Sequence, residues 1–119
     1  MTDLEHAPRP VVLRLPAEID LTNAERVGEE LCSAFTRGAA LVIADLTSTV
    51  FCDCAGARQL VLAHDYADAH DARIRFVIPV RNMLRVLTLT GAGRLLPIYP
   101  SLDAALSAGL APDRHAASG

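Results

Sequence analysis

The apolar residues of the chain form two kinds of pattern, which alternate along the sequence. Short continuous apolar runs predict strands that are buried in a sheet. They fall at residues 11–15, 40–45, 74–78 and 96–99. Stretches in which apolar residues recur every three or four positions predict amphipathic helices. They fall at residues 23–37, 55–70, 80–91 and 101–108.

Local signals mark where these elements begin and end. Residues 16–20 predict a turn, and Thr22 with Glu25 fits a capping box at the start of the first helix. Gly38 is placed to end that helix with a positive φ, and Asp53 fits an N-cap before the second helix. Four successive strand–helix pairs favour one α/β domain with a mostly parallel sheet and crossover helices.

The net charge and the lengths of the apolar runs argue against nucleic acids and membranes as partners. The chain has 119 residues, a net charge of −3 and a pI near 5.7, which gives no basic footprint for nucleic acid. No apolar run reaches the roughly 18 residues of a membrane span, and residues 1–10 lack the apolar core of an export signal. We therefore expect a cytoplasmic protein with reduced cysteines, and neither nucleic acids nor membranes as partners.

The sequence carries little that could support catalysis or metal binding. No metal-site spacing surrounds Cys52 and Cys54, and there is no phosphate-binding glycine loop or nucleophile elbow. A catalytic interpretation would rest on the Cys54 thiol alone, without a base near it in the sequence. We therefore expect no metal, no cofactor and no enzymatic activity.

Residues 45–56 (DLTSTVFCDCAG) form the most informative motif. They lead from a predicted buried strand into a helix, and they resemble the STAS family, specifically its stand-alone anti-sigma factor antagonists. The family pattern is Asp-Leu-(Ser/Thr)-x-Val-x-Phe-x-Asp-Ser-x-Gly, and this chain is one residue longer after Thr47. Two further stretches resemble the family in the same order. They are residues 17–22 (AEIDLT), and residues 86–91 (VLTLTG) with residues 96–99 (LPIY).

The resemblance implies a fold and its bounds. It covers residues 11–110, and it leaves flexible tails at residues 1–10 and 111–119. The implied fold is a single STAS-like α/β domain with a mixed, mostly parallel sheet of four to five strands. About four helices are expected to pack mainly on one side of that sheet.

The resemblance also implies a mode of action. In the family, the residue after the motif aspartate is a serine that a partner phosphorylates, and this partner is both an anti-sigma factor and a kinase of the histidine-kinase-like ATPase type. The unmodified antagonist binds the partner and frees the sigma factor, whereas the phosphorylated form dissociates. A phosphate adds about −1.5 to −2 charges, which weakens a packed interface strongly. The implied function is therefore indirect control of transcription through such an anti-sigma factor.

The chain departs from the family pattern at the phosphoacceptor position, where Cys54 stands in place of the serine. A cysteine is not a substrate for an ordinary Ser/Thr kinase. Three interpretations stay open: an antagonist that is always competent to bind, a thiol-based redox sensor, or a scaffold or transport-associated STAS subunit. A disulfide between Cys52 and Cys54 would be strained. Assembly into a homodimer also stays open.

The residues expected to contact the partner lie around the start of the second helix and in the loop before the first. Plainer roles are open for each of them: Asp53 as an N-cap, Cys54 as a small packed residue, and the loop residues as a turn. Gly56 is expected to allow a close backbone approach. The full set is Asp20, Leu21, Asp53, Cys54, Ala55, Gly56, Arg58, Leu62 and Tyr66.

Overall fold

The structure is a computed structural model that describes residues 9–79 and 96–108. Its main sheet has four strands in the order β1-β3-β5-β6, and all neighbouring pairs of this described sheet are parallel. The α/β class and the parallel sheet confirm the sequence prediction, and the strands begin and end within two residues of the predicted positions. They are β1 (Val11–Arg14), β3 (Leu41–Asp45), β5 (Arg73–Val77) and β6 (Ile98–Tyr99).

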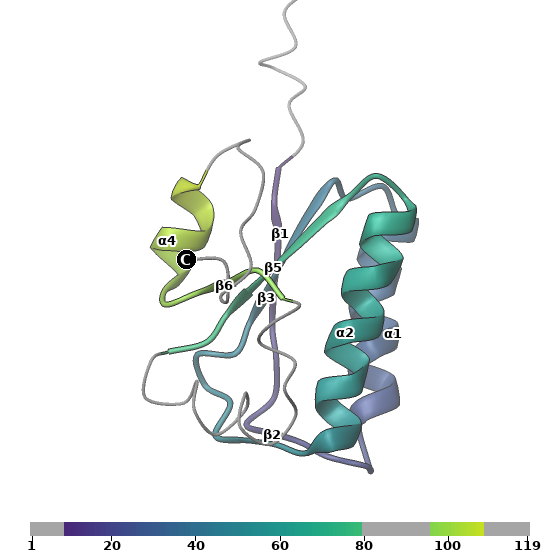
Figure 1. Ribbon diagram of the computed structural model, residues 1–119, viewed down its shortest axis with the longest axis vertical. Coiled ribbons are helices and arrows are strands. Elements are labelled where there is room, and N and C mark those ends of the chain that lie inside the picture. The colour runs from purple at the N-terminus through teal and green to yellow at the C-terminus, as the bar shows by residue number, and fades with distance from the viewer. Residues whose placement is uncertain (1–8, 80–95, 109–119) are drawn as a thin grey trace, which may run out of the picture.

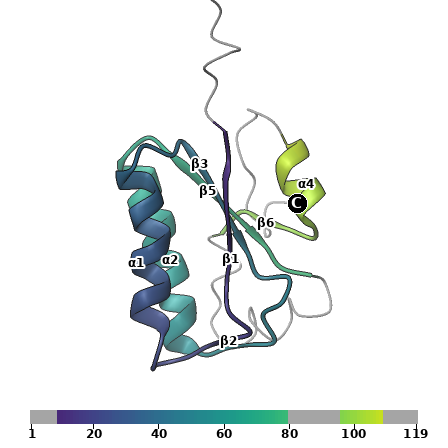
Figure 2. The same cartoon turned by 180° about the vertical axis from the view of Figure 1, so that it is seen from behind.

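Two helices, α1 (Ala24–Thr36) and α2 (Cys54–Ala69), lie side by side on one face of the sheet (Figure 1, Figure 2). Each one connects a strand to the next parallel strand, so both helices begin at the same end of the sheet. Their apolar stripes pack on inward-facing strand residues and form the main core. This core includes Val27, Leu31 and Phe35 from α1, Ala57, Leu60 and Ala63 from α2, and Val42, Ala44, Ile74 and Phe76 from the sheet.

The short helix α4 (Leu102–Ser107) lies on the opposite face of the sheet (Figure 1). Its N-cap is Ser101, whose hydroxyl accepts a hydrogen bond from the N–H of Ala104 at 3.1 Å. On the same face, the guanidinium of the buried Arg75 donates to the carbonyl of Ala105 at 2.8 Å. This hydrogen bond ties α4 to the sheet through a charged residue inside a strand that was predicted from its apolar neighbours.

A second, smaller sheet positions the site. It consists of β2 (Glu18–Ile19) and β4 (Phe51–Cys52), which pair in parallel. The N–H of Asp53 continues this pairing by donating to the carbonyl of Ile19 at 3.0 Å. The prediction of a simple turn at residues 16–20 is therefore wrong, because part of this stretch is extended and buries Ile19 completely. As a result, the loop before α1 lies beside the start of α2.

The predicted capping box at the start of α1 is also wrong. The N-cap is Asn23, without a side-chain capping bond, because the hydroxyl of Thr22 donates to the Asp20 carboxylate instead of to the helix. At the other end of α1, Gly38 follows the helix with φ +101°, as predicted. The predicted helix at residues 80–91 and most of the two predicted tails lie outside the described residues.

Candidate functional site

The candidate site is built around the junction between β4 and α2. Asp53 is the N-cap of α2, and its carboxylate accepts a hydrogen bond from the N–H of Gly56 at 2.9 Å. The carbonyl of Asp53 also accepts from the N–H of Ala57 at 2.9 Å. The N-cap role predicted for Asp53 is confirmed. These bonds hold the first turn of α2, which begins at Cys54, in one orientation.

The two cysteines at the junction have opposite environments. Cys54 is exposed, whereas Cys52 is 2% exposed and lies in the core. Burial, together with the nearby Asp53 and Cys54, raises the pKa of the Cys52 thiol to about 11. Neither residue forms a disulfide, and the same is true of Cys32. Of the two sulfurs at the junction, that of Cys54 is therefore the accessible one.

Gly56 allows a close approach, but the approach is inside the protein. A Cβ atom at this position would lie 2.6 Å from Cγ2 of Ile19 and 2.9 Å from Sγ of Cys52. The absence of a side chain thus lets the first turn of α2 pack directly on the β2–β4 pair. The buried Gly56 supports the junction from beneath.

The loop before α1 is held by its own hydrogen bonds. The carboxylate of Asp20 accepts from the N–H of Thr22 at 2.9 Å and from the Thr22 hydroxyl at 2.5 Å. The N–H of Asp20 donates to the side-chain oxygen of Asn23 at 2.9 Å. The Thr22 hydroxyl, followed by the backbone N–H groups, lowers the pKa of Asp20. This ordered turn leaves the side chain of Leu21 81% exposed.

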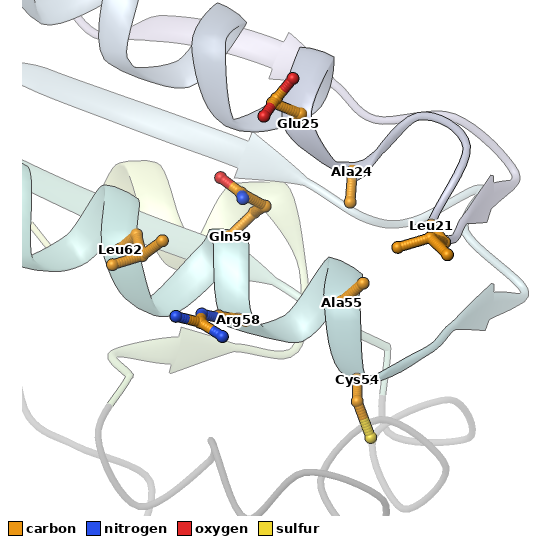
Figure 3. A pocket seen from close by; sticks show the side chains of 8 residues that line it. All are labelled: Leu21, Ala24, Glu25, Cys54, Ala55, Arg58, Gln59 and Leu62. Carbon is orange, nitrogen blue, oxygen red and sulfur yellow. The ribbon is translucent and has the colours of Figure 1, made fainter.

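The fold brings several of the predicted residues to one pocket of about 530 Å³ at the N-terminal end of α1 and α2 (Figure 3). Cys54 and Ala55 lie on the first turn of α2, Arg58 and Leu62 follow along the helix, and Leu21 faces them from the loop. The carboxyl groups of Asp20 and Asp53 do not line this pocket, since both accept hydrogen bonds from the backbone beside it.

Tyr66 is separate from this cluster. It is half-buried, its ring stacks on His70 with the centroids 4.2 Å apart, and it packs against the main core. It lines an adjoining pocket of about 560 Å³ together with Leu62 and Cys32. Of the three residues of α2 beyond its first turn that are expected to contact a partner, Arg58 and Leu62 are therefore exposed, whereas Tyr66 is half-buried.

Sequence reasoning missed the residues that α1 and the middle of α2 contribute to the first pocket. These are Ala24, Glu25 and Gln59. The spacing of Glu25 and Glu29 already placed two carboxylates on one face of the helix. Which face of α1 lies beside α2 depends on strand pairing, and the sequence alone carries no direct signal for it.

Two kinds of feature, a cluster of metal-binding side chains and a membrane-spanning helix, are absent from the described residues. In residues 9–79 and 96–108, no three side chains of the metal-binding types come together. No helix in the described part of the chain combines the length and the apolar character that a membrane crossing requires.

The fold and the exposed junction define the class of the protein: a small α/β domain of parallel strands whose candidate site lies on the surface at the start of α2. The chain belongs to the STAS domain family, whose family model matches residues 1–105. A comparison with curated proteins found no match.

Several solved structures share this fold. An anti-sigma factor antagonist from Mycobacterium paratuberculosis is 24% identical, with 82% of each chain covered and a TM-score of 0.71. The anti-sigma factor antagonist SpoIIAA in its unphosphorylated form is 18% identical, with 89% of this chain and 94% of that chain covered and a TM-score of 0.67. The phosphorylated form of the Bacillus cell fate determinant SpoIIAA is 21% identical, with 83% and 89% covered and a TM-score of 0.60. At these identities the likeness establishes the fold.

Proposed function

We propose that the protein is an anti-sigma factor antagonist that binds an anti-sigma factor of the histidine-kinase-like ATPase type. The observation that carries this proposal is the exposed Cys54, held at the first position of a capped helix where the family has a phosphorylated serine. The contact surface would include Asp20, Leu21, Asp53, Cys54, Ala55, Arg58 and Leu62, with Gly56 supporting the turn and Tyr66 at the far edge. The proposal places the protein in the cytoplasm and gives it no catalytic role.

The surface around the junction supports a protein partner. Leu21, Val50 and Phe51 are 81%, 55% and 41% exposed, and all three belong to the segments around the β2–β4 pair. Exposed large apolar side chains near a site are compatible with a surface that another protein covers. Two of the structural neighbours carry the name anti-sigma factor antagonist.

The sulfur at position 54 gives the proposal its distinctive feature. The similar protein SpoIIAA exists in an unphosphorylated and a phosphorylated form. A kinase that acts on hydroxyl groups would leave Cys54 unmodified, so no phosphate charge would enter the interface. We therefore expect a complex that persists when the partner is supplied with ATP.

The test uses purified histidine-kinase-like anti-sigma factors from the same genome, titrated with the protein by calorimetry. We expect a 1:1 complex with one of them, and an affinity that changes less than twofold after incubation with Mg²⁺ and ATP. The Cys54→Ser variant should bind equally well without ATP and become phosphorylated with ATP. The phosphorylated variant should then lose at least about tenfold in affinity, which corresponds to about 1.4 kcal/mol of binding free energy.

Ala69→Ser is the matched control, because it introduces the same hydroxyl at an exposed position of α2 that lies away from the first turn and lines neither pocket. It should behave like the wild type in both conditions. The proposal fails if none of the anti-sigma factors binds, or if ATP dissolves the wild-type complex as readily as the Cys54→Ser complex.

A second candidate, regulation by oxidation, is favoured by the exposure of Cys54, because an oxidant in solution can reach its thiol. The Cys54 sulfur, as the thiolate, would attack one oxygen of hydrogen peroxide while the O–O bond breaks, which gives a sulfenic acid on Cys54 and a hydroxide that takes a proton from solvent to become water. We expect a gain of one oxygen in the intact mass and a weaker complex, both absent in Cys54→Ser. Unchanged mass and affinity after peroxide treatment would exclude this candidate.

A further inference from the structure

A groove continues from the junction along the two parallel helices. Two pockets, of about 530 and about 560 Å³, share the side chains of Glu25, Gln59 and Leu62. The first pocket reaches Cys54 and the second reaches Tyr66, so together they follow α2 for twelve residues, or about 18 Å at 1.5 Å per residue. We call the two pockets together the α1–α2 groove.

The groove is apolar in its middle and acidic on both walls. Leu62 is 47% exposed at the point that the two pockets share. The exposed carboxylates of Glu25 and Glu29 line the α1 wall, and that of Asp65 lines the α2 wall. Arg58 is the single cationic side chain among the lining residues, and it lies in the pocket near Cys54.

The floor between the helices carries a polar group that a partner can reach. The side chain of Gln59 lies over Gly28, where a Cβ atom would stand only 2.1 Å from the amide oxygen of Gln59. Within the described residues this half-buried amide has no hydrogen-bond partner. A ligand seated in the groove would therefore find the Gln59 amide beside the apolar side chain of Leu62.

We propose that the α1–α2 groove binds a helix of the partner protein, about three turns long, with an apolar stripe flanked on both sides by Lys or Arg. The groove length suits about twelve helical residues, whose apolar stripe would contact Leu62. Carboxylates on both walls complement cations on both flanks, which would fix the register of the helix. That the helix belongs to an anti-sigma factor rests on the function proposed above.

The first test uses two synthetic peptides of about 14 residues, a length at which a helix can form. Both carry the same leucine stripe, one with lysines on its flanks and the other with glutamates. We expect the lysine peptide to bind at least about tenfold more tightly by calorimetry. Glu29→Lys and Asp65→Lys should each weaken its binding about fivefold, the effect of about 1 kcal/mol at a partly exposed ion pair.

The matched controls are Glu30→Lys and Asp68→Lys. Each makes the same charge reversal on the same helix, at an exposed residue that lines neither pocket. They should change the affinity for the lysine peptide less than twofold, and circular dichroism should report an unchanged fold for all four variants. Equal binding of the two peptides, no binding of the lysine peptide, or an equal loss in the controls would overturn the inference.

The second test separates this inference from the proposed function. The same four variants are titrated with the anti-sigma factor that binds the wild type, and the groove variants should lose affinity while the controls do not. If all four variants bind it like the wild type, the junction proposal stands and the groove inference is wrong. If no anti-sigma factor binds but the lysine peptide behaves as expected, the groove inference stands and the function proposed above is wrong.

Discussion

The three cysteines differ in environment, and the difference fixes their order of reactivity. Cys54 is exposed, Cys32 is half-buried with a pKa raised by burial, and Cys52 is buried with a pKa of about 11. Because the thiolate is the nucleophile, we expect iodoacetamide at pH 8 to label Cys54 first, Cys32 more slowly and Cys52 last. Peptide mass spectrometry over time measures the order. Labelling of Cys52 before Cys54 would contradict the geometry of the junction.

The raised pKa of Cys52 also predicts how stability changes in alkaline solution. Its pKa is about 11 in the folded protein against an ordinary value of 9.0, so the folded state holds this proton more strongly than the unfolded state. The stabilising contribution is complete below pH 9 and is lost as the pH rises from about 9 to about 11. Urea unfolding of wild type and Cys52→Ala across this range measures it. The difference in unfolding free energy between them should shrink as the pH rises, and a constant difference would contradict the prediction.

Asp53 is expected to contribute to stability as a helix cap. Asp53→Ala removes the acceptor for the N–H of Gly56 and should lower the free energy of unfolding by about 1 kcal/mol. Asp53→Asn keeps an acceptor oxygen and should cost less. Asp68→Ala, an exposed change inside the same helix, serves as the control in thermal unfolding. If Asp53→Ala is as stable as the wild type, the Asp53 cap does not stabilise α2 and the prediction is wrong.

At the scale of the elements, two glycines allow a direct comparison of how tightly the helices pack: Gly56 in the first turn of α2, and Gly28 in α1 beneath the side chain of Gln59. Gly56→Ala would place a Cβ atom against Ile19 and Cys52 in the core, and we expect a loss of about 1–3 kcal/mol from overpacking. Gly28→Ala meets the end of the Gln59 side chain, which can turn away. It should therefore change stability by less than about 1 kcal/mol. Denaturant unfolding of both variants checks this, and a larger loss for Gly28→Ala would contradict it.

The elements that the sequence predicted are those whose signals are local. The apolar runs of β3 and β5, the Asp53 cap and the Gly38 end of α1 depend only on neighbouring residues, and the structure has all of them. The pairing of β2 with β4 has no such signal, since each strand has two residues and its partner lies more than thirty positions away. The hydroxyl of Thr22 also bonds to Asp20 and does not cap α1, which the local capping pattern did not indicate.

At the scale of the whole molecule, the candidate site depends on how distant segments come together. The motif at residues 45–56 identified Cys54 and Asp53, because both residues belong to one continuous stretch that resembles the family pattern. The contribution of Glu25 and Gln59 could not be predicted in the same way, since it follows from the packing of α1 beside α2. The buried Arg75 likewise depends on distant segments, since its guanidinium donates to the Ala105 carbonyl of α4 and lies over the ring of Tyr99 in β6.

In the proposed complex, the start of α2 is the surface that the partner covers. The most direct measurement is the rate at which iodoacetamide labels Cys54 in the free protein and in a saturated complex with the anti-sigma factor. We expect the labelling of Cys54 to be at least about tenfold slower in the complex, because a packed interface excludes the reagent along with water. An unchanged rate in the saturated complex would contradict it, since the partner would then bind elsewhere on the molecule.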